Sequence, residues 1–272
     1  MSQQSPEQRL LDRMRAIGPL AVAYSGGVDS ALVLAAAVRA LGADRVLAVT
    51  AVSESLADGE LDRARLLADG LGVTHLTPRT SELASLGYRA NGPDRCYFCK
   101  STVLDTIAVL ARDHGFDQVA TGTNADDARD PHRPGIRAGR ERAIHTPLLD
   151  TGLDKTAVRR LSRSWALPTW SKPATPCLAS RIRYGVEVTP HRLARVDRAE
   201  VAVRALLANV GLNVSDLRVR DLGDAVRVEV DASIVDRVTQ LPEMARALAD
   251  AGFAELPYVV EAFRSGRLNS EM

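Results

Sequence analysis

Short apolar runs alternate with helix-forming segments through the first 165 residues of the chain. The apolar runs have the length of buried strands and lie at residues 20–24, 45–52, 73–76 and 118–121. Segments with the period or composition of helices lie at residues 6–17, 31–41, 58–71, 96–114 and 154–165. Strands separated by helices in this way predict an α/β fold, in which a parallel sheet carries helices on both faces.

Other stretches of this half have no helical period. Residues 81–95 and the polar segment 122–142 are predicted to be loops, and the length of the second favours a functional role. Residues 144–149 are apolar enough for a fifth strand or a strand end. A further irregular segment at residues 169–183 contains two prolines and marks a change of pattern, so we place a domain boundary there.

Beyond that boundary the pattern predicts a small α+β domain. It comprises a long amphipathic helix at 189–209, a hairpin from 217–220 and 225–230, a helical stretch at 234–248 interrupted by Pro242, and a strand at 258–263. We therefore expect two domains, residues 1–170 with the parallel sheet and residues 171–272 as the smaller unit.

Composition narrows the partners. The 272 residues carry a net charge of only +1, and 4% of them are aromatic, so we expect no nucleic-acid or membrane partner. No apolar run approaches the roughly 18 residues that a membrane span needs. Residues 1–8 are polar and lack the apolar core of a signal peptide, so we expect a cytoplasmic protein. Three cysteines, an odd number, make a disulfide framework unlikely in that compartment.

A glycine-rich turn, Ser25-Gly-Gly-Val-Asp-Ser30, follows the first predicted strand and precedes a helix. Gly26 and Gly27 allow positive φ and let an anion approach the backbone, where N–H groups at the helix start converge. Asp29 is a candidate Mg²⁺ ligand. No Gly-Lys-Ser/Thr follows, so this is not a Walker loop. The stretch resembles the PP-loop of the N-type ATP pyrophosphatases, which transfer AMP to an oxygen of their substrate. The alternative is an ordinary strand–helix turn.

The three cysteines form a second constellation: Cys96 and Cys99 as a CxxC pair, and Cys177 far downstream. Each is predicted to lie in a loop or at a helix start, where metal ligands can converge. A structural zinc site would need a fourth ligand, and no histidine stands at the usual spacing: His75, His114, His132, His145 and His191. A redox dithiol would leave Cys177 unexplained. A [4Fe–4S] cluster on three thiolates, with one iron open, and three free thiols are the other two interpretations.

Charged residues supply further candidates. Strand alternation places Arg218 and Arg220 on one face, and two arginines without matched acids fit an anion site; the alternative is the solvent face of a hairpin. Lys100 could offset charge on a departing pyrophosphate, or be an exposed helix lysine. Asp126 and Asp127 follow a predicted strand end, where ligands of parallel sheets bind.

Taken together in chain order, these motifs resemble one family over nearly the whole chain. They are Ser25-Gly-Gly-Val-Asp-Ser30, Asp94-Arg-Cys-Tyr-Phe-Cys-Lys100, Gly122-Thr-Asn-Ala-Asp-Asp127 with Arg133-Pro-Gly135, Cys177-Leu-Ala-Ser-Arg181, Arg218-Val-Arg220 with Arg227-Val-Glu229, and Phe263-Arg-Ser-Gly-Arg267. They resemble the LarE family of ATP-dependent sulfur transferases. Its members convert the carboxylates of pyridinium-3,5-biscarboxylic acid mononucleotide to thiocarboxylates, giving a precursor of the nickel-pincer nucleotide cofactor of lactate racemase.

The resemblance implies roles for the nucleotide and sulfur chemistry. The residues that would bind ATP and Mg²⁺ are Ser25, Gly26, Gly27, Asp29, Ser30 and Asp127. Cys177, Asp29 and Lys100 would be catalytic. Cys177 matches the cysteine that gives up its own sulfur in single-cysteine members. Because Cys96 and Cys99 are also present, the chain resembles the three-cysteine branch, in which a [4Fe–4S] cluster on the three thiolates carries an extra sulfide. The sulfur donor, and whether Cys177 is consumed, stay open.

The resemblance also implies a substrate site, a metal site and an assembly. The substrate would be held by Ser180, Arg181, Arg218, Arg220 and Arg264. Glu200, Glu229 and Asp236 fall near acidic metal-binding positions of the family, of which Glu229 is matched by a motif. The family assembly suggests a homo-hexamer.

Three alternatives use the same turn. A tRNA thiolase would pair it with a three-cysteine cluster, but near-neutral charge argues against a long RNA footprint. An amide-forming ATP pyrophosphatase, such as an NAD synthetase, would leave the cysteines idle. A non-catalytic nucleotide sensor would not release pyrophosphate in response to a carboxylate substrate.

Overall fold

The computed structural model describes residues 4–129, 133–173 and 175–264. The chain forms two compact units. Unit 1 comprises Met1–Ser53, Asp58–Glu82 and Asp94–Thr175, and unit 2 comprises Glu54–Ala57, Leu83–Pro93 and Pro176–Met272. The sequence-based division into 1–170 and 171–272 has no counterpart for the two short segments of unit 2 that interrupt unit 1. They join unit 2 through contacts distant in sequence, such as the bond from the Leu178 amide to the Ser55 carbonyl (2.9 Å).

Unit 1 is built on a four-stranded parallel sheet in the order β3-β2-β1-β4. The strands are β1 (Leu20–Ala23), β2 (Val46–Val49), β3 (Thr74–Leu76) and β4 (Gln118–Ala120). The predicted parallel α/β sheet is confirmed. Residues 144–149, predicted as a fifth strand or a strand end, form no fifth strand: His145 makes a single bridge to Ala120, and Pro147, which has no N–H to donate, begins the short helix α7 (Pro147–Asp150).

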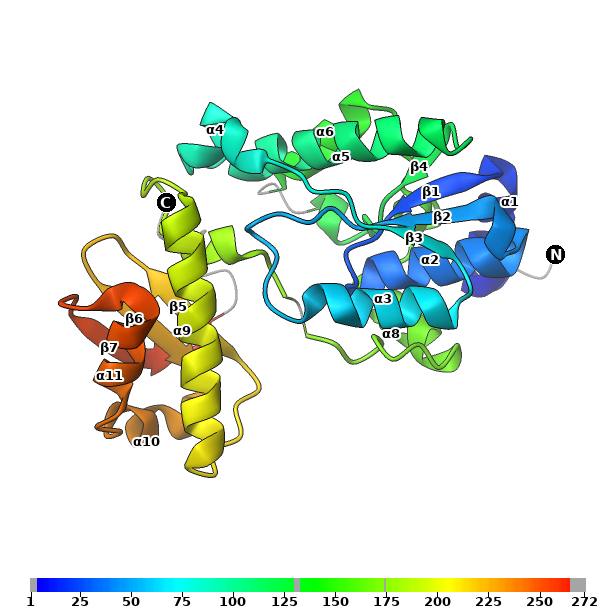
Figure 1. Ribbon diagram of the computed structural model, residues 1–272. Helices are drawn as coiled ribbons and strands as arrows, with labels where there is room; N and C mark the ends of the chain where they lie inside the picture. The colour runs from blue at the N-terminus through cyan, green and yellow to red at the C-terminus, as the bar shows by residue number, and fades with distance from the viewer. Residues whose placement is uncertain (1–3, 130–132, 174, 265–272) are drawn as a thin grey trace. The chain divides into compact units, whose positions relative to one another are not determined.

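Helices cover both faces of this sheet (Figure 1). Alternate residues of β1 enter different cores, with Leu20 and Val22 on one side and Ala21 and Ala23 on the other. The first core is closed by α1 (Pro6–Ile17), α2 (Val28–Leu41), α3 (Glu60–Gly70), α7 and α8 (Lys155–Ser164). The second is closed by α5 (Arg95–Asp113). This two-faced burial explains why the central strands β1 and β2 are continuously apolar rather than alternating.

The long loop predicted at 122–142 is only partly a loop. Its second half forms α6 (Pro134–Glu141), which packs on α5. The helix is tied down by tertiary contacts: the Tyr97 hydroxyl donates to Glu141 (2.5 Å), and Arg142 makes two bonds to Asp105 (2.7 and 2.9 Å). The helix has only eight residues, and contacts of this kind cannot be recognised as a periodic pattern in its sequence. Residues 130–132, which include His132, lie outside the described residues.

Unit 2 has the predicted α+β content. Its elements are α4 (Leu86–Arg89), α9 (Pro190–Asn209), β5 (Leu217–Asp221), β6 (Val226–Val230), α10 (Val235–Thr239), α11 (Met244–Leu248) and β7 (Tyr258–Ala262). β5 and β6 form the predicted antiparallel hairpin, and β7 pairs with β6 in parallel. Asp221, fully buried, receives bonds from Arg192 and Arg195 of α9, which joins that helix to the sheet.

None of the helices in the described ranges combines the length and apolar character that a bilayer crossing requires.

Candidate active site

The glycine-rich turn lies between β1 and α2, as predicted. Gly26 has φ +71°, and a Cβ at this position would lie 3.2 Å from the Cβ of Ala64, so both the backbone and the space require glycine. α2 begins at Val28 with Gly27 as its N-cap, and no side chain caps it. The first N–H groups of α2 therefore remain available to an anion, and the helix dipole favours negative charge there.

Ser30 shapes this turn. Its buried Oγ accepts a hydrogen bond from the Ser25 amide (3.2 Å), lies 3.2 Å from the Ser25 Oγ and donates to the Gly27 carbonyl (3.2 Å). Ser25 itself is exposed. Ser30 therefore stabilises the conformation of the loop, whereas Ser25 lies where a ligand can contact it.

The loop after β4 is fastened to the start of α2. A Cβ on Gly122 would lie 2.6 Å from the Ser30 backbone nitrogen, so the two backbones touch. The Asn124 side chain donates to Asp29 Oδ1 (3.1 Å) and accepts from the amides of Asp126 and Asp127 (2.9 and 3.0 Å). The structure therefore brings Asp29 and Asp127, two predicted site residues, to one edge of the sheet.

Two lysines at this edge of the sheet were not predicted as site residues from the sequence. Lys155 Nζ is 2.5 Å from Asp29 Oδ2, so the candidate Mg²⁺ ligand already has a cationic partner. The only signal in the sequence is the position of Lys155 as the first residue of α8, because a cation is unfavourable at a helix N-terminus unless another group compensates it.

Lys172 is the second of these lysines. Its Nζ donates to the Gly26 carbonyl (2.9 Å) and to Glu60 Oε2 (2.7 Å). Burial alone would raise the pKa of Glu60, but hydrogen bonds and charges from Lys172 and Arg63 outweigh it and lower that pKa below its usual value. Lys172 lies in the irregular segment 169–183 and belongs to no motif, so the sequence offered no signal for this contact.

The first turn of α5 carries Cys96, exposed, and Cys99, half-buried. Lys100 follows. A Cβ on Gly135 would be 3.5 Å from the Cys96 carbonyl and 3.6 Å from the Lys100 Cβ, so α6 lies directly against this turn. Burial lowers the pKa of the Lys100 ammonium, while the charges of Cys99 and Asp127 oppose that shift. Lys100 is therefore not an exposed helix lysine.

Cys177 belongs to unit 2, whereas Cys96 and Cys99 belong to unit 1. It precedes a single 3₁₀ turn, Leu178–Arg181, and is exposed. Within the residues described, no group of three or more His, Cys, Asp or Glu side chains is gathered so that it could hold a metal ion.

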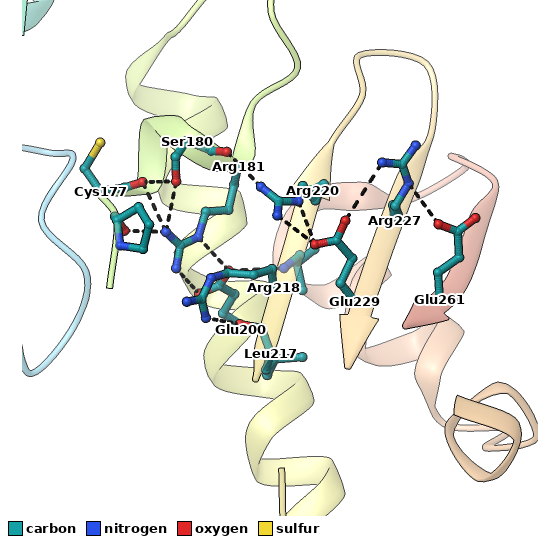
Figure 2. Close-up of polar contacts among 12 residues, drawn as sticks. Cys177, Ser180, Arg181, Glu200, Leu217, Arg218, Arg220, Arg227, Glu229 and Glu261 are labelled. Carbon is teal, nitrogen blue, oxygen red and sulfur yellow. Dashed lines mark hydrogen bonds and ion pairs between the residues drawn. The ribbon is translucent and has the colours of Figure 1, made fainter. Parts of the chain in front are cut away.

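Arg181 organises the turn that carries Cys177 (Figure 2). Its side chain is 1% exposed, and its guanidinium forms a two-bond pair with Glu200 (2.9 and 3.1 Å). It also donates to the carbonyls of Pro176 and Cys177 (the latter at 3.2 Å) and to the Ser180 Oγ (3.1 Å). The residue that the resemblance assigns to substrate is thus occupied by the protein itself.

The two arginines of β5 are buried rather than solvent-facing. Arg220 is not without a matched acid: it makes two bonds to Glu229 Oε2 (2.9 and 2.7 Å), which corrects the premise of an unpaired arginine couple. Burial lowers the pKa of Arg218, the charge of Arg181 adds to this, and Glu200 opposes it. The Arg218 guanidinium lies 5.4 Å from the ring centre of Phe263. A buried guanidinium of this kind suits an anionic ligand.

The three candidate acidic metal ligands lie in different surroundings. Glu200 and Glu229 are bonded to arginines, and Asp236 is exposed on α10. To hold a divalent cation, Glu200 and Glu229 would have to exchange these arginine bonds for the metal. Arg264, a candidate substrate residue, is exposed at the end of the described residues, and Arg267 of the same motif lies outside them.

A parallel sheet whose glycine-rich turn opens a helix N-terminus to an anion is the arrangement of a phosphate-binding α/β protein, and the motif Ser25-Gly-Gly-Val-Asp-Ser30 with the family match that follows places it in the ATP-using PP-loop class. A model of the asparagine synthase family matches residues 7–91, which contain this turn. An NH₃-dependent NAD⁺ synthetase of Chlorobaculum tepidum is 33% identical over 93 residues, about a third of each chain (34% of this one, 33% of that one).

Two relatives match far more of the chain. An uncharacterized protein of Synechocystis sp. is 42% identical over 251 residues, 91% of each chain. A pyridinium-3,5-bisthiocarboxylic acid mononucleotide synthase of Lactiplantibacillus plantarum is 33% identical over 264 residues, 97% of this chain and 93% of that one. The chain belongs to the LarE family of ATP-dependent sulfurtransferases.

Proposed function

We propose that the protein adenylates the carboxylates of pyridinium-3,5-biscarboxylic acid mononucleotide and replaces an oxygen of each with sulfur, on the way to a nickel-pincer nucleotide cofactor. The observation that carries this proposal is the near full-length match to the Lactiplantibacillus plantarum synthase, together with a helix N-terminus open to pyrophosphate. Lactate racemase is the expected client of the cofactor.

The first step needs a leaving group, because a carboxylate is negative and would have to expel oxide. Attack of the carboxylate oxygen on the α-phosphorus of ATP releases pyrophosphate and gives an acyl adenylate. The amides at the start of α2 stabilise the charge that develops on pyrophosphate, and Mg²⁺ would be held at Asp29 and Asp127. Lys100 adds a cation whose lowered pKa reflects its desolvation.

The second step is attack of a sulfur nucleophile on the acyl carbon, which forms the C–S bond and expels AMP. Cys177 takes part in this step either as a ligand of a cluster that carries the sulfide or as the donor of its own sulfur, which would then leave its Cβ; its thiol is exposed while its backbone is bonded to Arg181. Arg218 is the arginine we assign to the substrate's anionic groups, since it is buried and faces the positive charge of Arg181.

A [4Fe–4S] cluster would be held by Cys96, Cys99 and Cys177. The donor chemistry fits: thiols are the ligands of such clusters, and two of these stand three residues apart at the accessible start of α5, on one side of the helix. When bound, the cluster would supply the sulfide that ends in the thiocarboxylate. We also expect a cytoplasmic homo-hexamer with no nucleic-acid or membrane partner.

The test follows both half-reactions with the dicarboxylate mononucleotide under anaerobic conditions. Pyrophosphate release that depends on the substrate, and a product heavier by one S-for-O exchange, are the expected results. Cys177→Ala should abolish the thiocarboxylate and retain pyrophosphate release. The proposal would be refuted if pyrophosphate release did not depend on the mononucleotide, or if it required ammonia or tRNA.

The sulfur source has its own test. We expect the anaerobically purified protein to be brown, with the broad visible absorption of an Fe–S cluster, and to keep its mass over several turnovers. A colourless, zinc-bearing protein after iron–sulfur reconstitution would exclude the cluster. Loss of about one H₂S per chain after turnover would instead show that Cys177 is consumed.

A further inference from the structure

We propose that Arg181, held by the partly buried Glu200, is a positioning residue that sets the backbone of Cys177 for sulfur transfer rather than a ligand of the substrate, and that Arg220, held by the buried Glu229, supports the turn that follows Cys177. The inference rests on the proposed function for the reaction in which Cys177 takes part. It concerns the contacts that join the turn at Leu178–Arg181 to α9 and the β5–β6 hairpin (Figure 2).

Every nitrogen of the Arg181 guanidinium donates a hydrogen bond within the protein. Nε and Nη2 bond the two oxygens of Glu200, and Nη1 bonds the carbonyls of Pro176 and Cys177 together with the Ser180 Oγ. A side chain 1% exposed and so committed would have to break internal bonds to receive a phosphate or carboxylate. Its donors instead converge on the peptide that carries the cysteine.

The glutamate that orients Arg181 is itself anchored. Glu200 comes from α9, and its Oε1 also accepts from the Val219 amide of β5 (3.1 Å). The line of contacts therefore runs from the sheet through the Glu200 carboxylate to the guanidinium and on to the carbonyl of Cys177. Because the Arg181–Glu200 pair has fork-shaped, two-bond geometry, it transmits orientation and not only charge.

Arg220 makes contacts of the same kind from the other side of the turn. Its Nε and Nη2 bond Glu229, which is fully buried, and its Nη1 donates to the Ser180 carbonyl (3.0 Å). The Ser180 hydroxyl in turn donates to the Cys177 carbonyl (2.7 Å). Two arginine–glutamate pairs thus bond different carbonyls of one short segment, Arg181 those of Pro176 and Cys177 before the turn and Arg220 that of Ser180 within it.

The consequence concerns the thiol. In Figure 2 the Cys177 carbonyl faces Ser180 and Arg181, whereas the sulfur points away from the arginines. The backbone of the residue is immobilised, while its reactive atom stays exposed. Such an arrangement suits sulfur transfer, because a nucleophile misplaced by about 1 Å can lose on the order of a hundredfold in rate.

The experiment compares Arg181→Lys and Glu200→Gln with wild type, using the dicarboxylate mononucleotide, ATP and Mg²⁺. Arg192→Lys is the matched control, since it alters another arginine–carboxylate pair of unit 2, between the partly buried Arg192 and the buried Asp221, that does not touch the turn. We expect both test variants to release pyrophosphate within about twofold of wild type, with unchanged KM for the mononucleotide. The kcat for thiocarboxylate should fall roughly 10- to 100-fold. A KM that rises at unchanged kcat would overturn the inference and assign Arg181 to the substrate.

A second readout does not depend on the substrate. In protein prepared without iron, so that no cluster covers the thiols, iodoacetamide labelling resolved by peptide mass spectrometry should change at Cys177 by several-fold in the test variants and leave Cys96 as it is in wild type. If labelling of Cys177 is unchanged, the inference fails even if the proposed function stands; if no thiocarboxylate forms in wild type, the proposed function fails and labelling still decides the inference. Should the variants not fold, Ser180→Ala removes the 2.7 Å bond to the Cys177 carbonyl and the 3.1 Å bond from Arg181 to the Ser180 Oγ, leaves the Arg181–Glu200 pair in place, and is expected to give the same pattern more weakly.

Discussion

Gly122 is the position at which a single methyl group should do most damage to nucleotide binding. A Cβ there would lie 2.6 Å from the Ser30 backbone nitrogen, 2.9 Å from the Asp29 carbonyl carbon and 3.0 Å from the Asp29 Cβ. All three atoms belong to the first turn of α2, so no flexible side-chain end can move aside. Restoring an ordinary contact of at least 3.4 Å requires a displacement of about 0.8 Å between the loop after β4 and α2.

The expected effect of Gly122→Ala has a stability part and a functional part. Overpacking of this kind costs roughly 1–3 kcal/mol, and at about 2–4 °C per kcal/mol the midpoint of thermal unfolding should fall by several degrees. The amides that face pyrophosphate and the Asp29 carboxylate move with α2. We therefore expect substrate-dependent pyrophosphate release to fall on the order of 10- to 100-fold, with a raised KM for ATP.

The assay is pyrophosphate release against ATP concentration, alongside thermal unfolding. Gly70→Ala is the control, because Gly70 is exposed near the end of α3, its φ is not positive, and its Cβ would meet nothing within 4 Å. That variant should match wild type or unfold slightly later. A Gly122→Ala protein with the ATP kinetics and unfolding midpoint of wild type would refute the argument that these two backbones are in contact.

Three further outcomes follow from the charges around the PP-loop. Lys172→Met should weaken ATP binding, measured by calorimetry, and lower the unfolding midpoint, because it frees the Gly26 carbonyl and removes one of the two cations that are bonded to the buried Glu60. The pKa of Glu60 is lower in the folded state, so its ionised form adds stability above its unfolded pKa, near 4.5, and this is lost as pH falls through the folded pKa. The stability gap between wild type and Glu60→Gln should therefore shrink on acidification below about pH 4.5 in urea titrations; a gap that widens would contradict the assignment. Because burial lowers the pKa of Lys100, pyrophosphate release should decline at lower alkaline pH in wild type than in Lys100→Arg, and identical alkaline limbs would remove Lys100 from the step.

The sequence by itself determined the elements and the nucleotide chemistry. Strand lengths and helical periods located β1 to β4 and α9. The turn at Ser25–Ser30 indicated an anion site, because glycine, aspartate and serine act there through local backbone geometry. The hairpin of β5 and β6 was likewise visible from alternation and the turn between its strands. Each of these signals lies within about twenty neighbouring residues, which is the range over which periodicity carries information.

Only the tertiary structure decided which charged side chains are already paired within the protein. The partners of Asp29, Glu60, Arg181 and Arg220 lie 126, 112, 19 and 9 positions away. Helix α6 was missed for the same reason, since packing on α5 and not an internal period stabilises it. Residue type shows that an arginine can bind an anion, but only the folded chain shows whether a buried carboxylate of its own already occupies it, because burial makes the nearest opposite charge the preferred partner.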